Sequence, residues 1–215
     1  MPYGECWQLQ QQLFSATLAS KGADVERCGT LLLVEHPAVY TLGKSGKEQN
    51  MLVSEEFLKS IGAEFYHIDR GGDITFHGEG QIVGYPILDL EQVGLGLKDY
   101  IDAIEGAVID TIATYGIEGG RIEGASGVWI DINSPRPRKI CAIGVRASRY
   151  VTMHGFALNV ATDLNYFNYI NPCGFTDRGV TSIEKEIGRK VSLEEVKERL
   201  VEALSRKLDV KIYKS

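Results

Sequence analysis

Apolar residues recur every three or four positions in the segments that predict helices, which is the spacing of one buried helical face. The predicted helices cover residues 5–20, 54–61, 97–115 and 192–207. Ser54 and Ser192 stand just before two of them as N-terminal caps, and Glu195 completes a capping-box pattern with Ser192. The chain therefore has four predicted helices, of which 97–115 has the clearest apolar face.

Short runs of apolar and β-branched residues, bounded by glycine, proline or polar turns, predict strands. These runs fall at 30–35, 39–43, 64–69, 128–132, 139–145 and 150–159, with two more inside the glycine-rich stretch 70–90. The runs 128–132 and 139–145 flank a short loop and predict a hairpin. Because strands and helices do not alternate strictly, the pattern predicts an α/β (α+β) fold with a mixed or antiparallel sheet and flanking helices.

Composition narrows the class of protein without changing this picture. A chain of 215 residues with 44% hydrophobic residues suits a single domain over 1–215. The sequence has no secretory signal and no apolar run of membrane-spanning length, so we expect a cytoplasmic protein with no membrane partner. A net charge of -6 argues against a nucleic-acid binder. Its four cysteines lack CxxC spacing, so neither a disulfide framework nor a metal site is expected.

Cys173 is the first candidate for chemistry, because Pro172 fixes the backbone before its thiol and Gly174 frees the backbone after it. Such a turn can present a nucleophile into a cleft, although an ordinary loop cysteine would look the same. A catalytic cysteine also needs a nearby cation or base, because only the thiolate attacks.

Lys139 is the candidate partner, because it opens an otherwise apolar strand. It either extends to solvent along its aliphatic stem or lies partly desolvated and exchanges a proton with a thiol. Cys141 lies two residues further on and is expected to share the strand face of Lys139. Its neighbours Ile140 and Ala142 are apolar, which favours an inert buried thiol over a nucleophile.

A glycine-rich segment from Arg70 to Gln81 places two glycine turns around a short strand that ends at His77. Glycines let a ligand approach the backbone, but the segment lacks the spacing of both a P-loop and a dinucleotide motif. It therefore predicts either a ligand site or a glycine-rich hairpin. His154 either belongs to the core or lines a site, whereas His36 and His67 are interpreted as structural.

Four segments in order resemble the family of lipoyl(octanoyl) transferases. They are HPAVYTLG at 36–43, RGGDITFHGEGQIVGYPILDL at 70–90, KICAIGVRASRYVTMHGFALNV at 139–160 and NPCGFTDRGVTSIEKE at 171–186. The resemblance implies a fold like the catalytic domain of biotin and lipoate protein ligases. It also implies transfer of an octanoyl or lipoyl group from acyl carrier protein to a lysine of lipoyl domains. Those domains belong to 2-oxoacid dehydrogenase subunits and the glycine cleavage H protein, and no cofactor is implied.

The same resemblance assigns roles to residues. It places the acyl-thioester cysteine at Cys173 and the lysine that tunes it at Lys139. Its substrate-binding stretches fall on Arg70, Gly71, Gly72, Asp73, Ile74, Thr75, Phe76, His77, Gly78, Ala142, Ile143, Gly144, His154, Gly155, Phe156 and Ala157. Glu79 departs from the family pattern, in which a proline is usual between the two glycines. An oxyanion donor is expected either from backbone N–H groups near Gly174 or from a histidine such as His77.

Two other functions remain open at this point. One is an ATP-dependent lipoate ligase of the same fold, and the other is a non-catalytic module that binds acyl chains or lipoyl domains. Acyl carrier proteins are acidic, so a chain with net charge -6 needs a local basic patch to attract them. The candidates around Lys139 are Arg136, Arg138, Arg146 and Arg149, which could equally be ordinary solvated charges.

Overall fold

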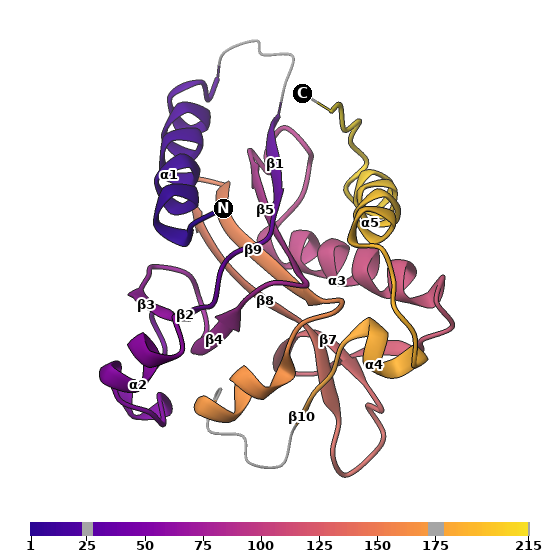
Figure 1. Cartoon of the computed structure of the whole chain (residues 1–215). Coiled ribbons are helices and arrows are strands. Elements are labelled where there is room, and N and C mark those ends of the chain that lie inside the picture. The colour runs from indigo at the N-terminus through magenta and orange to yellow at the C-terminus, as the bar shows by residue number, and fades with distance from the viewer. Residues whose placement is uncertain (23–27, 172–178, 215) are drawn as a thin grey trace.

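The computed structural model describes residues 1–22, 28–171 and 179–214 (Figure 1). Its main sheet has the strand order β1-β5-β9-β8-β7-β6, with β10 paired to β8. These strands are β1 (Gly29–Val34), β5 (Gln81–Leu88), β9 (Val151–Asn159), β8 (Arg138–Ser148), β7 (Ala125–Ile130), β6 (Gly119–Ile122) and β10 (Gly179–Val180). Every pair in this sheet is antiparallel except β10 with β8.

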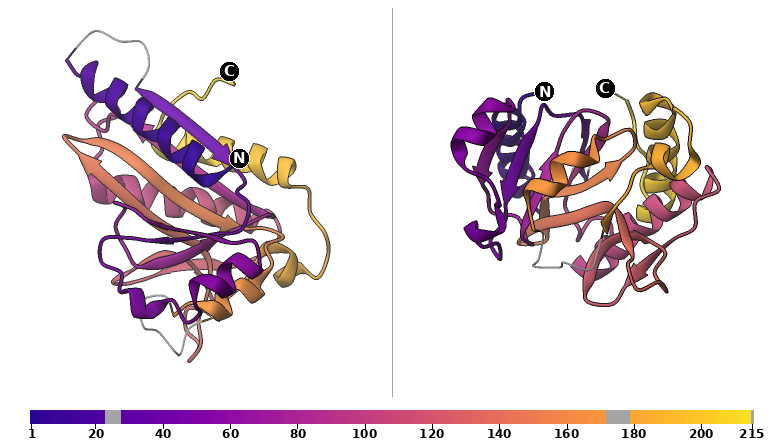
Figure 2. Two further views of the ribbon diagram at one scale, coloured as in Figure 1. Left: turned by 60° about the vertical axis from the view of Figure 1, so that its left-hand side comes forward. Right: turned by 60° about the horizontal axis from the view of Figure 1, so that its bottom comes forward.

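A second sheet of three strands lies beside the first and holds the glycine-rich segment. Its strands are β3 (Glu64–His67), β2 (Val39–Leu42) and β4 (Ile74–His77), in that order. The helical elements are α1 (Tyr3–Ala19), η1 (Glu48–Asn50), α2 (Glu55–Ser60), α3 (Leu97–Ala113), η2 (Leu164–Tyr169), α4 (Ile183–Ile187) and α5 (Leu193–Leu208). Helix α1 covers one face of the main sheet, and α3 with α5 covers the other (Figures 1 and 2).

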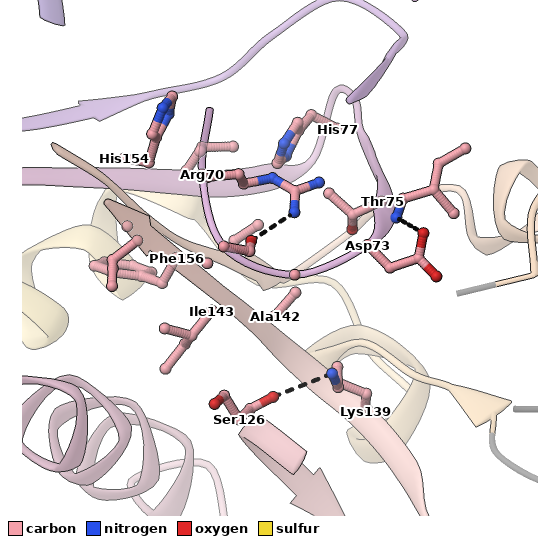
Figure 3. Close-up of a pocket in the computed structure, with 18 of the residues that line it drawn as sticks. Arg70, Asp73, Thr75, His77, Ser126, Lys139, Ala142, Ile143, His154 and Phe156 are labelled. Atoms are coloured by element: carbon pink, nitrogen blue, oxygen red, sulfur yellow. Dashed lines mark hydrogen bonds between the residues drawn. The ribbon is translucent and has the colours of Figure 1, made fainter. Parts of the chain in front are cut away.

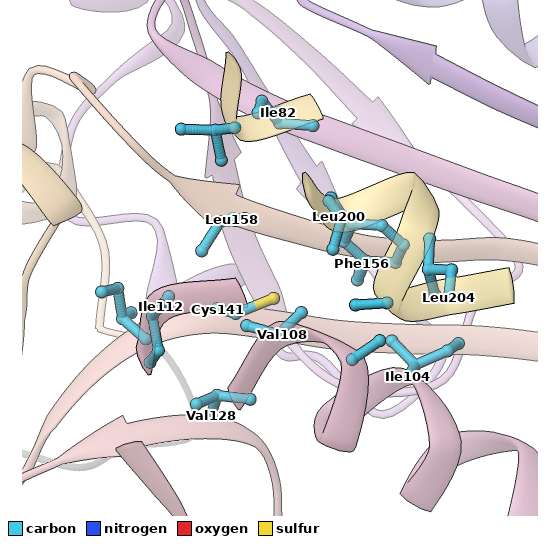
Figure 4. Packing of buried hydrophobic residues seen from close by; sticks show 14 of the residues in the cluster. Ile82, Ile104, Val108, Ile112, Val128, Cys141, Phe156, Leu158, Leu200 and Leu204 are labelled. Atoms are coloured by element: carbon cyan, nitrogen blue, oxygen red, sulfur yellow. The ribbon is translucent and has the colours of Figure 1, made fainter. Parts of the chain in front are cut away.

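The largest hydrophobic cluster fills the space between the main sheet and helices α3 and α5 (Figure 4). Along α3 the apolar side chains recur every four residues, so they lie on one face and are all fully buried: Tyr100, Ile104, Val108 and Ile112. Leu200 and Leu204 face them from α5. Each such side chain contributes about 1.5–3 kcal/mol to folding, so this layer holds the sheet that carries the site.

The predicted α/β fold with a mixed sheet and flanking helices is confirmed, as are the four helices and the hairpin of β7 and β8. The elements that the pattern missed are short: η1, β6, η2, β10 and α4. They contain too few residues to show a period, and β6 begins with two glycines. Among the described residues, no helix is both long enough and apolar enough to cross a membrane.

Candidate active site

A pocket of about 810 Å³ lies between the glycine-rich segment and strands β8 and β9 (Figure 3). Residues 70–73 cross over the sheet there, and we call them the strap. The strap is bonded to β8, because Gly71 N–H donates to the carbonyl of Val145 at 2.9 Å. It is also bonded to the segment after β2, because Lys44 N–H donates to the carbonyl of Arg70 at 3.0 Å. The pocket therefore has a roof fixed to its floor.

The buried side chain of Arg70 fixes the strap to β2 through hydrogen bonds. Its guanidinium donates through Nη2 to the carbonyl oxygen of Thr41 at 2.7 Å and to Oγ1 of Thr41 at 3.0 Å. Nη1 donates to the carbonyl oxygen of Gly71 at 3.0 Å. Because the side chain is buried, these charge-assisted bonds fix the strap against β2 in a low-dielectric environment.

Glycines allow the strap to approach the sheet so closely. Gly144 of β8 pairs with Gly155 of β9, so neither strand has a side chain at that level. A Cβ on Gly144 would lie 2.8 Å from the carbonyl oxygen of Gly71. On the same face of the sheet, the next pair toward Lys139 is Ala142 with Ala157, whose methyl groups leave the floor of the pocket low and apolar.

Lys139 faces the pocket because β8 contains a β-bulge. Trp129 pairs with Lys139, but the adjacent Val128 pairs with Cys141, so Ile140 is an extra residue in β8. A bulge re-aims the side chains around it. Lys139 consequently lies on the same face as Trp129, with Nζ 4.5 Å from the ring centroid, and donates to the carbonyl of Ser126 at 3.1 Å.

The expectation that Cys141 shares the strand face of Lys139 is wrong, and the bulge is the physical reason. Ile140 and Cys141 both point into the core between the sheet and α3, where each is fully buried (Figure 4). Burial raises the pKa of the Cys141 thiol well above its usual value, so the thiolate is not available at neutral pH. The interpretation of Cys141 as an inert core thiol agrees with this placement.

Cys173 lies outside the described residues, as does Gly174. The described residues that flank 172–178 are Asn171 and Gly179, and both line the pocket. Val180 pairs with Lys139 through β10 and β8. The segment that contains Cys173 in the sequence is thus bounded on both sides by residues of the same pocket as Lys139.

His77 is buried at the inner end of the pocket, and its ring is fully engaged. Nδ1–H donates to Oε1 of Gln81 at 2.9 Å. The amide nitrogen of Gln81 donates to Oδ1 of Asn159 at 2.9 Å, so its carbonyl oxygen is the atom that faces His77 and can only accept. Nε2 accepts from Oγ1 of Thr41 at 3.5 Å. Burial lowers the pKa of His77 from 6.5 to about 3, so the ring stays neutral. In this arrangement the N–H of His77 is engaged with Gln81, which argues against His77 as an oxyanion donor, and that role stays a prediction.

Buried neutral histidines predict that the fold loses stability in mild acid. Burial also lowers the pKa of His36 to about 4, and the unfolded chain would protonate both His36 and His77 near pH 6.5. Below pH 6.5 the unfolded state then binds more protons, so the free energy of unfolding should fall by about 2 kcal/mol per histidine at pH 5. Urea unfolding between pH 7.5 and 5 measures this slope.

Two variants separate this cause from general acid sensitivity. His36→Gln should remove about 2 kcal/mol of the loss at pH 5, because His36 is one of the buried histidines that cause it. His67→Gln is the matched control, since the His67 side chain is 59% exposed, and it should keep the wild-type slope. A wild-type slope in His36→Gln would contradict the assignment.

His154 lines the pocket from β9 in a left-handed conformation with φ of 61°, which is rare outside glycine. Burial lowers its pKa, so the neutral ring donates Nε2–H to the carboxylate of Asp69 at 2.8 Å. Nδ1 is buried and has no hydrogen-bond partner among the described residues. The hydrogen bond with His154 in turn lowers the pKa of Asp69. His154 is thus held by the residue that precedes the strap.

The four arginines do not form one basic cluster around Lys139. Arg138 donates to Asp131 at 2.6 Å and to Glu186 at 2.5 Å, and Arg146 forms an ion pair with Asp69. Strand β8 separates Arg138 from the turn that holds Arg149 by about 33 Å, at roughly 3.3 Å per residue. Two of the candidate charges are therefore already paired, and the set is divided between the two ends of one strand.

Most of the residues predicted for the site meet at this one pocket. Those that line it are Arg70, Gly71, Gly72, Asp73, Ile74, Thr75, His77, Lys139, Ala142, Ile143, Gly144, His154, Gly155, Phe156 and Ala157. Phe76 does not line it, because strand alternation turns its ring into the core of the small sheet, where it stacks on Tyr166 at 4.6 Å. Gly78 also lies outside the lining and packs against the Phe76 ring.

Sequence reasoning missed lining residues that come from other elements. They include Tyr3, Gln81, Tyr85, Leu97, Ile101, Trp129 and Asn159. Tyr3 opens α1, and its ring stacks on His77 with centroids 6.0 Å apart. The apolar spacing of residues 5–20 predicts the helix. It does not predict that the helix begins at Tyr3 or that this residue lines the pocket. Among the described residues, no cluster of three or more metal-ligand side chains is present.

Known proteins are similar to this chain in sequence, and others are similar to it in fold. The family model of the lipoyl protein ligase A/B catalytic domain matches residues 2–205. The octanoyltransferase of Bacteroides fragilis strain YCH46 is 58% identical over 200 residues, which is 93% of this chain and 90% of that protein.

Solved structures with much lower identity share the fold. An archaeal bipartite lipoate protein ligase from Thermoplasma acidophilum, studied with its E2 lipoyl domain, matches with TM-score 0.70 at 15% identity, over 96% of this chain and 81% of that one. Lipoate-protein ligase A bound with ATP matches with TM-score 0.70 at 16% identity, over 96% and 83%. The expected likeness to lipoate ligase catalytic domains is therefore confirmed at the level of fold.

Proposed function

The chain belongs to the lipoyl protein ligase A/B catalytic domain family, and on this premise we propose that it moves an octanoyl group from acyl carrier protein to a lysine of a lipoyl domain through a thioester on Cys173. The family resemblance predicted from four sequence segments is confirmed, and the chain is an acyltransferase of octanoyl transfer in protein lipoylation. The donor, the thioester and the acceptor lysine are the parts that we propose.

One observation carries the proposal. Lys139 is aimed into an apolar-floored pocket, and the described residues on both sides of 172–178, Asn171 and Gly179, line the same pocket. A cationic amine beside an acyl-sized pocket is the environment that a nucleophilic cysteine requires. Cys173 follows Asn171 by two positions in the sequence, which makes it the cysteine that this environment would activate.

The proposed reaction has two balanced steps. In the first, the Cys173 thiolate attacks the octanoyl carbonyl, a new thioester forms, and the phosphopantetheine thiol of the donor leaves with a proton from Lys139. In the second, the acceptor lysine amine attacks the acyl-cysteine, an amide forms, the Cys173 thiolate is released, and the amine proton goes to Lys139, which regains the proton that it gave in the first step. One thioester replaces another in the first step, so the proposal requires neither ATP nor a cofactor.

The proposed acceptors are the lipoyl domains of 2-oxoacid dehydrogenase subunits and the glycine cleavage H protein. The archaeal ligase with the same fold was studied together with its E2 lipoyl domain, and this supports a lipoyl domain as the partner. The acceptor lysine would have to reach Lys139, whose amine donates to the carbonyl of Ser126 in β7 at 3.1 Å, at an exposed position.

Intact-mass spectrometry after incubation with octanoyl acyl carrier protein, without ATP, tests the proposal. We expect a gain of one octanoyl group, mapped by peptide analysis to Cys173 and removed by neutral hydroxylamine, which cleaves thioesters. Addition of a lipoyl domain should discharge the adduct onto a lysine. A protein that stays unmodified without ATP but modifies the lipoyl domain from octanoate and ATP would be a ligase, and the proposal would be wrong.

A substitution on the floor of the pocket tests where the acyl chain lies. Ala142→Leu adds three carbon atoms beside Lys139, so we expect the acylation rate with an eight-carbon donor to fall about tenfold or more, the effect of an overpacking cost of about 1–3 kcal/mol. A four-carbon donor should lose much less. Ala147→Leu is the matched control, because Ala147 lies on the same strand but is exposed and does not line the pocket. Equal losses for both chain lengths would place the chain elsewhere.

A further inference from the structure

Glu105 is a buried carboxylate on α3 that the proposed mechanism does not use. It is only 5% exposed, because it lies on the helix face that packs against the hairpin of β6 and β7. Its Oε1 accepts a hydrogen bond from the backbone N–H of Gly127 at 2.8 Å. Its Oε2 accepts from Nε of Arg121 at 2.8 Å, and Arg121 also donates to the carbonyl of Asp102 at 2.8 Å. Both carboxylate oxygens are thus committed to fixing β6 and β7.

Gly127, whose backbone N–H donates to Glu105, occupies a position that favours glycine. Gly127 has φ of 118°, a conformation that side chains rarely adopt. A Cβ there would lie 2.4 Å from the carbonyl oxygen of Cys141 and 3.4 Å from Cε of Lys139. The backbone of Gly127 therefore lies directly beneath the Lys139 side chain.

The peptide that joins Ser126 to Gly127 connects the hydrogen bond with Glu105 to the pocket. Its N–H is the group that Glu105 binds, and its carbonyl, which belongs to Ser126, accepts from Nζ of Lys139 at 3.1 Å (Figure 3). One rigid peptide unit thus has the buried carboxylate on one side and the amine on the other. Rotation of this peptide would move the acceptor away from Nζ, and the hydrogen bond that the Gly127 N–H donates to Glu105 opposes that rotation.

We propose that Glu105 is a positioning residue for acyl transfer, which holds the Ser126–Gly127 peptide and thereby keeps the Lys139 amine in the pocket. The proposal rests on the proposed function, because it assumes that Lys139 serves Cys173. The Glu105 carboxylate acts through the hydrogen bond to Gly127 and not through its charge. Arg121 stabilises the carboxylate from the other side, and its half-exposed side chain can leave without disturbing Gly127.

Two conservative variants separate position from charge. Glu105→Gln keeps an oxygen that can accept from Gly127 but loses the charge, whereas Glu105→Asp keeps the charge but is one methylene too short to reach. The measurement is the single-turnover rate of Cys173 acylation by saturating octanoyl acyl carrier protein, followed by intact mass. We expect Glu105→Asp to lower this rate about tenfold or more, as expected when a reacting group is misplaced by a fraction of an ångström, and Glu105→Gln to lose clearly less.

The controls separate positioning from loss of folding and from failure of the proposed function. Asp110→Asn lies on the same helix in a half-exposed ion pair with Lys207 and should leave the rate unchanged. Thermal unfolding identifies the folded fraction of each variant, and rates are compared per folded molecule. The reverse order, with Glu105→Asp active and Glu105→Gln impaired, would overturn the positioning route, as would wild-type rates in both. Absence of any adduct in the wild type would instead overturn the proposed function.

Discussion

Replacing Cys173 by alanine is expected to lower the rate of octanoyl transfer to a lipoyl domain by about 10⁴-fold or more, because removing a nucleophile forces the reaction onto an uncatalysed route. The acyl adduct should disappear from the intact-mass spectrum altogether. Cys173→Ser should behave almost as poorly, since a serine hydroxyl beside an amine is far less ionised than a thiol. Transfer is measured by mass spectrometry of the lipoyl domain under multiple-turnover conditions.

Two other cysteines of the chain, Cys28 and Cys141, serve as controls. Cys28→Ala removes a partly exposed thiol that lies outside the pocket, so its rate and its adduct should equal those of the wild type. Cys141 is fully buried, and it should resist alkylation in the folded protein. An adduct that persists in Cys173→Ala and disappears in Cys28→Ala would show that the proposed nucleophile is wrong.

Replacing Lys139 by methionine is expected to slow acylation of Cys173 by about 10²–10³-fold, the usual contribution of a positioned acid–base group. Methionine has a flexible unbranched side chain of similar reach, so the packing beside Trp129 should survive without the cation–π contact of Nζ. It removes the amine that would stabilise the thiolate and carry protons in both steps. The acylation rate is measured in single turnover with saturating octanoyl acyl carrier protein.

Alkylation of Cys173 by iodoacetamide over a range of pH gives a second measurement that needs no acyl donor. In Lys139→Met the pH at which alkylation reaches half its maximum rate should rise, because the thiolate loses its nearby cation. Lys139→Arg should keep more of this thiolate effect than of the acylation rate, since a guanidinium holds its proton too tightly to transfer it. Lys59→Met, in the last turn of α2, is the distant control. Identical alkylation profiles in all four proteins would contradict a role for Lys139 at Cys173.

The sequence predicts the layers of this fold well because period and caps act locally. The apolar positions of α3 recur with helical spacing, and Ser54 and Ser192 accept the capping hydrogen bonds that their positions predict. The face of Lys139 could not be predicted in this way. Strict alternation would place Lys139 and Cys141 together, and only the pairing of β8 with β7 shows that Ile140 is inserted between them.

The same limit applies to the rest of the pocket. Resemblance to a family located the strap and the small residues of β8 and β9, but it did not reach α1, whose Tyr3 contributes to the lining. Ordinary sequence signals also gave no warning that Arg138 and Arg146 are engaged with Glu186 and Asp69. Contacts between residues tens of positions apart depend on topology, and a single sequence does not display them.

The extra residue at position 140 determines which face of the sheet Lys139 occupies. This effect comes from the presence of one more residue in β8 and not from the chemistry of its side chain. Side chains along a strand alternate between the two faces of the sheet. Removal of one residue from β8 would therefore move side chains from one face to the other on one side of the deletion, relative to β9. A scan that replaces Ile140 by other amino acids would report only a buried apolar position. A point substitution leaves the number of residues in β8 unchanged, whereas a single-codon deletion does not, so engineering of β8 should treat its length as a functional property.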